Sequence, residues 1–255
     1  MSLNLIDTHC HLDHLDHKPF ENILNDAKNV GVTKFISIGA SRGKDSCFKA
    51  IELSKQYPQI WASIGVHPHD AGRTALEEVS ALASEDKVVA IGETGLDFFR
   101  DWSPFDQQRK LFIASINLAK ELKKPLIIHC RDANEETVKT LKELNAKEVG
   151  GVFHCYGGTA EFARELADIN FRVSLTGIIT FKNTHALRSE ITQIPLEQIL
   201  LETDCPYMAP EPFRGKPAEP MHVYQIALKL AEIKKLTIEE IAAQTNENVK
   251  KLFGI

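Results

Sequence analysis

The chain has 255 residues, of which 43% are hydrophobic and 25% are charged, and its formal net charge at neutral pH is −5. This length and apolar content suffice for one large core. The negative charge excludes a protein that attracts nucleic acid over its whole surface, so any such binding would need a local patch of cations.

The cysteines and the apolar runs bear on where the protein works. The five cysteines include no CxxC pair, and this usage is typical of reduced thiols in a reducing compartment. No apolar run reaches the roughly 18 residues that a membrane span requires. The segment Met1–Asp7 does not predict a secretory signal. We therefore expect a soluble cytoplasmic protein with no membrane association and no obligate protein partner.

Short apolar runs alternate with longer segments of helical periodicity along the whole chain. Near-continuous apolar runs of this kind predict parallel strands that are buried on both faces. The sequence contains eight of them: Leu3–Asp7, Thr33–Ile38, Ile60–Gly65, Val88–Gly92, Leu126–His129, Gly151–His154, Arg172–Leu175 and Ile199–Glu202.

The segments between these runs carry signals for helix ends. Apolar residues recur at helical spacing over residues 22–31, and Gly31 suits the end of that helix. The sequences Thr74–Glu77 and Thr237–Glu240 both match a capping box, which predicts that a helix begins at each. Pro104 predicts the first turn of a long helix.

Eight β–α units in one chain of this length predict an α/β fold, the (β/α)8 TIM barrel. A doubly wound open sheet is the alternative, because strand order cannot be deduced from alternation. No linker rich in Pro, Gly or Ser divides the sequence, so we expect residues 1–255 to form a single domain. The helical segment Ile238–Phe253 follows the eighth unit and is expected as an extra C-terminal helix.

Side chains that can bind metal ions stand at the ends of five of the eight predicted strands. The first strand is followed by two histidines that are two residues apart, so both point the same way in an extended chain. In a barrel the carboxyl ends of all strands meet at one mouth, so the whole set is expected to converge. The set comprises His9, His11, Glu93, His129, His154 and Asp204.

Four imidazoles and two carboxylates predict a metal centre, since imidazole suits zinc and carboxylates also serve manganese and magnesium. Six protein ligands are more than one catalytic zinc ion uses, so two divalent ions (Zn2+, Mg2+ or Mn2+) bridged by Glu93 are the simpler hypothesis. A lone histidine would more often be a hydrogen-bonded core residue. Burying several such groups together is costly, however, unless something pairs them.

Basic residues near the same strand ends are candidates for substrate contact. Arg131 follows the fifth strand, and Arg214 and Lys216 follow the eighth, where barrel enzymes often bind phosphate. Arg100 lies in the loop after the fourth strand. Each of these cations could instead form a surface ion pair. His67 follows the third strand and is expected either to face substrate or to pack in its loop.

Four cysteines directly follow proposed ligands. Cys10, Cys130 and Cys155 should face the helices, because neighbouring residues in a strand point to opposite sides, so we expect their thiols to pack there. Thiolate ligation by these residues and by Cys205 is the alternative. His14 and His17 follow the first strand in a loop and are expected to be solvated.

Segments from one end of the chain to the other resemble the TatD family of metal-dependent hydrolases, a branch of the amidohydrolase superfamily. The matching segments are IDTHCHLD (6–13), GVHPH (65–69), GETGLDF (92–98), IIHCRDA (127–133), FHCYGG (153–158), ETDCPYMAP (202–210), RGK (214–216) and TNENVKKLFG (245–254).

The resemblance implies a barrel with a two-metal site. It places His9 and His11 on the first metal with Asp204 beside it, Glu93 as the bridge, and the remaining two histidines on the second metal. The sequence departs from many relatives at Cys205, where they have Ser, and at 217–220, where they have Asn-Glu-Pro or Asn-Gln-Pro. The second departure bears on the choice of substrate.

The predicted site supports hydrolysis. Two cations lower the pKa of a shared water, Glu93 holds them together, and Asp204 is placed to take the proton. The resemblance implies a deoxyribonuclease or phosphodiesterase that binds DNA or another phosphodiester transiently. An ester or amide hydrolase, for example an aminoacyl-tRNA deacylase, would use the same site. A metal-binding scaffold without turnover is disfavoured by the complete ligand set and by Asp204.

Overall fold

The computed structural model describes residues 3–255, and in this part of the chain eight strands form one sheet whose order follows the sequence. A doubly wound sheet reverses its strand order at a switch point, whereas this order is that of a (β/α)8 barrel. The fold-class prediction is therefore confirmed. The strands are β1 (Leu5–Cys10), β2 (Val32–Gly39), β3 (Ile60–Ile64), β4 (Val88–Asp97), β5 (Leu126–Arg131), β6 (Gly151–Phe153), β7 (Phe171–Leu175) and β8 (Ile199–Leu201).

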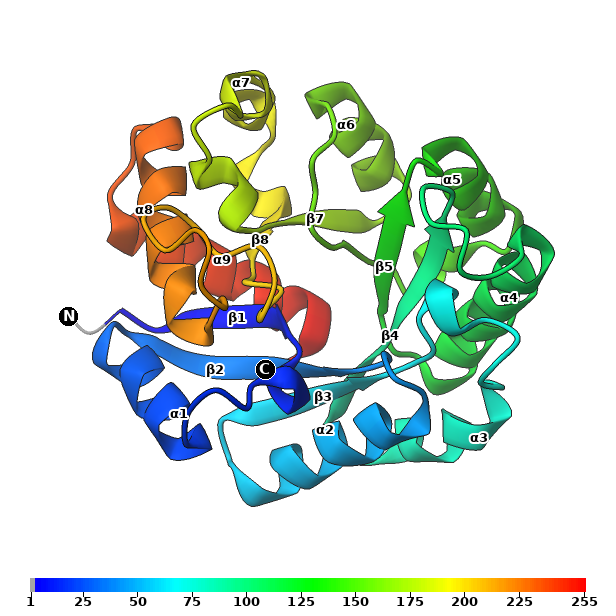
Figure 1. Ribbon diagram of the computed structural model, residues 1–255. Helices are drawn as coiled ribbons and strands as arrows, with labels where there is room; N and C mark the ends of the chain where they lie inside the picture. Colours follow the sequence, from blue (N-terminus) through cyan, green and yellow to red (C-terminus); the bar gives the residue numbers. More distant parts are fainter. Residues whose placement is uncertain (1–2) are drawn as a thin grey trace. The chain divides into compact units, whose positions relative to one another are not determined.

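Helices alternate with the strands along the chain (Figure 1). None of the helices within residues 3–255 is both long enough and apolar enough to cross a membrane. The helices are α1 (Phe20–Asn29), α2 (Lys44–Gln56), α3 (Glu77–Ser80), α4 (Phe105–Leu122), α5 (Asn134–Glu143), α6 (Ala160–Asp168), α7 (His185–Gln193), α8 (Val223–Lys234) and α9 (Ile238–Phe253).

The predicted helix ends are confirmed in three of four cases. Pro104 is the N-cap of α4, Gly31 follows α1 with a φ of +86°, and Thr237 forms the predicted capping box of α9. The capping box at Thr74–Glu77 is wrong: α3 begins only at Glu77, and its N-cap is Leu76. Four residues make a single turn, which gains too few backbone hydrogen bonds for a local sequence signal to fix its start.

The described chain clusters into two compact units, each assembled from several segments. One unit, called the first unit below, comprises the chain through Ile36, Cys155–Ala167 and Arg172–Ile255. The second unit comprises Ser37–His154 and Asp168–Phe171. The boundaries fall inside β2 and β7, so each of these strands is divided between the units.

In the second unit, β3, β4, β5 and β6 pair in parallel. β4 is five residues longer than the apolar run Val88–Gly92 predicts, because its pairing with β5 continues to Asp97 opposite Arg131. Gly95 makes that pairing possible: its φ is +139°, and a Cβ there would lie 2.0 Å from the carbonyl oxygen of His129. The extension carries Glu93 and Asp97 on one continuous strand.

In the first unit, the chain after β8 runs beside β1. The backbone N–H of Asp204 donates to the carbonyl of His9 at 2.9 Å, and that of His11 donates to the carbonyl of Cys205 at 3.0 Å. The C-terminal helix α9 is tied to the start of β8, since the buried Asn248 amide donates to the carbonyls of Leu196 and Ile199, both at 2.8 Å. These bonds fix the ends of β1 and β8 next to each other.

Candidate metal centre

Glu93, on β4, presents one carboxylate oxygen to three imidazoles of the second unit. Its Oε1 lies 2.7 Å from Nε2 of His154, 3.0 Å from Nδ1 of His129 and 3.2 Å from Nε2 of His67. Glu93 is 2% exposed. Such a group is held inside a protein only with charged or hydrogen-bonding partners, and here all three partners are nitrogen donors that also bind metals.

The imidazole of His67 has a defined tautomer. Its Nδ1 accepts the backbone N–H of His69 at 3.1 Å, so its proton resides on Nε2 and is donated to Glu93. Burial lowers the pKa of His67 to about 4, although Glu93 acts in the opposite direction. His67 is thus a neutral donor that faces the cluster, whereas its contact with substrate stays a prediction.

Asp97 orients His129 from the other side. Its Oδ2 lies 2.9 Å from Nε2 of His129 and 2.7 Å from Nε2 of His69, and the carboxylate is itself buried. With Nε2 held by Asp97, Nδ1 of His129 faces Glu93 and lies 3.4 Å from Nε2 of His154. A carboxylate behind a histidine in this way fixes the ring of a metal ligand.

Sequence analysis did not select Asp97 as a site residue. A signal for it was present in the sequence. Residues 93, 95 and 97 are spaced two apart, and this spacing places side chains on one face of a strand. The apolar run ends at Gly92, so the strand was predicted to stop before this pattern began.

The charges of the cluster favour a cation. Burial alone would raise the pKa of Glu93, but His154 and His67 outweigh it and hold that pKa well below its usual range. Burial likewise lowers the pKa of His129, but its bonds to Asp97 and Glu93 dominate and raise it. Burial also favours a raised pKa of Asp97, but its bonds to His129, to the Arg100 backbone and to His69 outweigh burial and lower that pKa, so two ionised carboxylates flank His129. Oxygen and nitrogen donors of His67, Glu93 and His129 all lie within 4.8 Å of one another, a donor set that fits a divalent metal.

The first unit brings together the three other predicted ligands. Oδ1 of Asp204 lies 3.4 Å from Nε2 of His11 and 3.7 Å from Nε2 of His9, and all three residues are buried. Asp204 has a φ of +56°, a conformation that Asp tolerates better than most residues and that turns its side chain at the end of the strand. One carboxylate and two imidazoles are again a fitting donor set.

Asp7 and Thr203 hold this second donor set in place. Oδ1 of Asp7 accepts the backbone N–H of Thr203 at 3.0 Å, and Oδ2 accepts the Thr203 hydroxyl at 2.5 Å. Burial raises the pKa of Asp7 to about 8, although the bonds from Thr203 act against it. The pair fastens β1 to the segment that carries Asp204.

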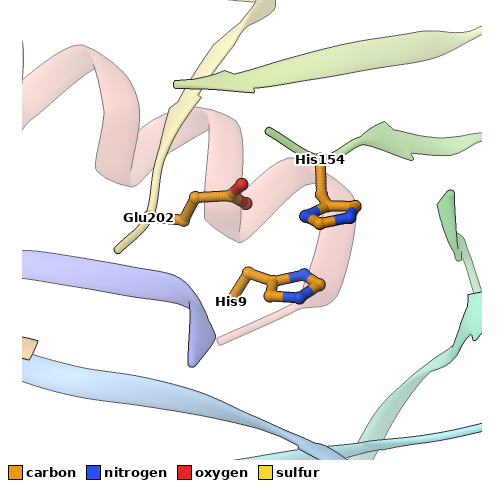
Figure 2. A group of neighbouring side chains, drawn as sticks. All are labelled: His9, His154 and Glu202. Carbon is orange, nitrogen blue, oxygen red and sulfur yellow. The ribbon is translucent and has the colours of Figure 1, made fainter. Parts of the chain in front are cut away.

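Glu202 is a further buried acid of the first unit. Figure 2 shows it beside His9, with both side chains pointing the same way from their strands; the figure also labels His154, which follows β6. Oε1 of Glu202 accepts the backbone N–H of Cys155 at 2.6 Å. This bond joins the chain after β6 to the end of β8.

The predicted substrate cations lie on the surface. The Arg131 guanidinium stacks 4.2 Å from the centre of the Phe99 ring. Arg214 stacks 3.9 Å from the Phe181 ring and donates to the carbonyl of Ala209 at 3.0 Å. Lys216 is exposed in the same loop after β8.

The prediction that His14 is solvated is wrong, since its ring stacks on His11 at 5.0 Å and its side chain is 2% exposed. A short 3-10 turn directly after β1 folds it back over that strand's end. His17 is one-third exposed and bonds to Glu219 at 2.8 Å.

Two cysteines next to ligands point away from them, as predicted. The Cys130 thiol bonds to Asn134 and Thr137 of α5, and the buried Cys10 thiol donates to the carbonyl of Ile36. Burial raises the pKa of both thiols, so they stay protonated and are poor metal ligands.

Comparison with protein families matches residues 6–254 to the family described as TatD related DNase. Among curated relatives, an uncharacterized metal-dependent hydrolase of Bacillus subtilis, YabD, is 44% identical over 98% of this chain and 99% of its own. The 3'-5' ssDNA/RNA exonuclease TatD of Escherichia fergusonii is 35% identical over 93% of this chain and 94% of its own.

Solved structures of the same family are similar to this chain. The TatD homologue YJJV of Escherichia coli K12 superposes with a TM-score of 0.90 at 29% identity and covers 100% of both chains. A hydrolase of the TatD family from Entamoeba histolytica gives a TM-score of 0.87 at 25% identity over 99% of both chains.

Proposed function

The chain belongs to the TatD-related DNase family of metal-dependent hydrolases, and on that premise we propose that it hydrolyses phosphodiester bonds of single-stranded DNA from a strand end. The observation that carries the proposal is the Glu93 carboxylate, whose one oxygen is shared by three imidazoles in a buried cluster. A relative that is named as a 3'-5' single-strand exonuclease supports the choice of substrate.

We propose two divalent cations in one centre. His129 and His154 would hold one cation, His9, His11 and Asp204 the other, and Glu93 would bridge them. Support comes from the donor set inside each unit and from the position of the six residues in or shortly after the strands β1, β4, β5, β6 and β8. The bound ions would supply a water of lowered pKa and offset the charge of the phosphate.

The chain's own residues then complete the reaction. Asp204 takes the proton of the attacking water and returns it to the leaving oxygen. Asp97 holds His129 in the orientation that cation binding requires. His67 directs its Nε2 proton at the cluster and would donate a hydrogen bond to substrate. Arg131, and Arg214 with Lys216, would meet substrate phosphates.

Release of nucleotides from end-labelled single-stranded DNA, with added Mg2+, Mn2+ or Zn2+, tests the proposal. We expect metal-dependent release that EDTA abolishes. Substrates labelled at the 3' or at the 5' end show from which end of the strand the enzyme cleaves. Asp204→Asn should lower turnover by about 100-fold or more while metal content falls much less. Equal losses of metal and turnover would make Asp204 a ligand only.

The absence of release from a protein that holds two metal ions would contradict the nuclease and direct attention to carboxylic ester or amide substrates. Absence of both release and bound metal would contradict the metal centre itself.

We propose in addition that residues 1–255 act as one domain in the cytoplasm. None of the five cysteines, which all lie within the described residues, forms a disulfide, and this supports a reducing compartment.

A further inference from the structure

The segment after β4 exposes a group of large aromatic side chains. Phe98, Phe99, Trp102 and Phe105 are 46%, 52%, 58% and 41% exposed, respectively. They make up four of the eight large hydrophobic side chains that are exposed within residues 3–255, and they lie within eight consecutive positions. A concentration of exposed apolar rings on a folded surface marks a binding site more often than chance exposure does.

Two arginines are interleaved with these rings. The Arg131 guanidinium lies 4.2 Å from the centre of the Phe99 ring, and that of Arg100 lies 5.2 Å from both Phe99 and Trp102. Within the part of the chain that the structure describes, neither guanidinium is paired with a carboxylate. We call Phe99, Arg100, Trp102 and Arg131 the aromatic platform.

The platform stands on an anchored loop. Oδ1 of Asp97 accepts the backbone N–H groups of Phe99 and Arg100 at 2.9 and 2.8 Å. The buried Gln108 amide donates to the carbonyls of Ser103 and Asp97 at 3.0 and 3.1 Å, and the Ser103 hydroxyl donates to Ala71. The rings are therefore displayed by a segment whose backbone is already held, which lowers the entropic cost of binding.

The platform adjoins the candidate metal centre. The Trp102 ring contacts that of His69 at 4.5 Å, and His69 and His129 share the Asp97 carboxylate. A pocket of about 460 Å3 beside the loop is lined by Asp97, Phe99 and Arg100, among others. Two other acidic residues line this pocket. Glu136 is paired with Arg109 at 3.0 Å, whereas Asp101 belongs to the loop that carries the rings.

We propose that the aromatic platform binds the bases of single-stranded nucleic acid by stacking on Phe99 and Trp102, while Arg100 and Arg131 contact the adjoining phosphates. Every base offers a flat face to an aromatic ring, and guanidinium groups pair with phosphate. A duplex hides those faces in its own stack, so the platform selects single strands. This inference rests on the proposed nuclease function and names the part of the site that positions the strand.

Binding is measured first, in EDTA, by tryptophan fluorescence as an oligothymidylate of about 12 nucleotides is added, a length within the usual range for single-strand sites. The chain has two tryptophans, Trp61 and Trp102. We expect quenching in the native protein and in Trp61→Phe, but none in Trp102→Phe. An abasic strand of the same length should bind roughly tenfold more weakly to the native protein, and a duplex more weakly still.

Hydrolysis is measured second, with metal present. Phe99→Ala and Trp102→Ala should each raise KM for the oligothymidylate roughly tenfold, with kcat nearly unchanged. An abasic strand of the same length should give the same KM with the native protein and with both variants, because it offers no bases to the platform. Phe48→Ala is the matched control, because Phe48 is 51% exposed on α2 and lies outside the platform.

The two proposals fail in different ways. Equal affinity for abasic and normal strands, or platform variants with native KM, would overturn the platform even if the nuclease is active. Quenching that depends on Trp102, in a protein that releases no nucleotide, would support the platform and contradict the nuclease. If the oligothymidylate does not bind at all, the surface serves another partner, such as a protein, and the platform is overturned.

Discussion

Histidine 129 illustrates how much of the candidate site depends on single atoms. Its Nδ1 faces Glu93 at 3.0 Å and its Nε2 faces Asp97 at 2.9 Å. A ring that rotated by half a turn would present a carbon atom to Glu93 in place of Nδ1. We therefore expect Asp97 to raise metal affinity by orienting His129, although Asp97 is not itself proposed as a metal ligand.

Asp97→Asn tests this role of the carboxylate. The amide keeps the shape of the side chain but loses its charge, so His129 is held less firmly and metal affinity should fall about 10- to 100-fold. Affinity is measured by competition with a chelator of known strength. Asp70→Asn, at a residue paired with the exposed Arg73, is the control and should bind metal like the native protein. Native affinity in Asp97→Asn would refute the positioning role.

His222 is a buried histidine whose protonation affects the free energy of unfolding. Its Nδ1 accepts the backbone N–H of Glu219 at 3.0 Å, and burial lowers its pKa from 6.5 to about 4. As pH falls below 6.5, the unfolded chain binds a proton at His222 and the folded chain does not. The free energy of unfolding should therefore fall between pH 6.5 and pH 4, by at most about 3 kcal/mol from this residue.

His222→Gln should remove that contribution, so its free energy of unfolding should vary less over this pH range than that of the native protein. Urea unfolding at pH 7, 5.5 and 4.5 measures the difference. His185→Gln, at an exposed position on α7, is the matched control. Parallel curves for native protein and His222→Gln would show that burial does not depress the proton affinity of His222.

Strand β4 is the element on which the second unit's donors depend. It carries Glu93 and Asp97, and its close pairing with β5 sets their distance from His129. The pairing tolerates no side chain at Gly95, for which both the φ of +139° and the space require glycine.

Gly95→Ala should destabilise the protein by more than about 3 kcal/mol, because the new Cβ combines backbone strain with a clash against β5. Gly157→Ala is the control: no atom lies within 4 Å of its Cβ position, so the free energy of unfolding should change by less than about 1 kcal/mol. Urea denaturation midpoints of the two variants and of the native protein measure these changes in stability. Similar midpoints for both variants would mean that β4 and β5 can separate without cost.

Two compact units built from interleaved segments raise the question of whether the chain unfolds in one step. β2 and β7 are each divided between the units, so neither unit keeps all of its strands if the other unfolds. This favours a single cooperative transition, in keeping with the proposed single domain.

The positions of the tryptophans make this testable. Trp61 and Trp102 both lie in the second unit, so fluorescence reports that unit, whereas far-ultraviolet circular dichroism reports helices of both. We expect the two signals to change at the same urea concentration. A fluorescence transition separated from the dichroism transition would show that the units unfold independently and would contradict the single domain.

Local patterns in the sequence determined most of the secondary structure. All eight predicted strands are present, because an apolar run that is buried on both faces is a property of its own residues. Apolar residues at helical spacing predicted the long helices in the same way, whereas the start of the one-turn α3 was predicted wrongly. The six proposed ligands were found because each follows or ends such a run, and metal binding itself stays a prediction.

Tertiary structure alone decided the features that depend on neighbouring segments. β4 reaches Asp97 because β5 offers it backbone partners, which no apolar pattern reveals. The side chain of His14 is buried because a turn folds it onto His11. The ring nitrogens that face each carboxylate, and the exposure of Phe99 and Trp102, likewise follow from contacts between distant segments. Periodicity determines which side of its own strand or helix a residue faces, but only packing determines what it meets there.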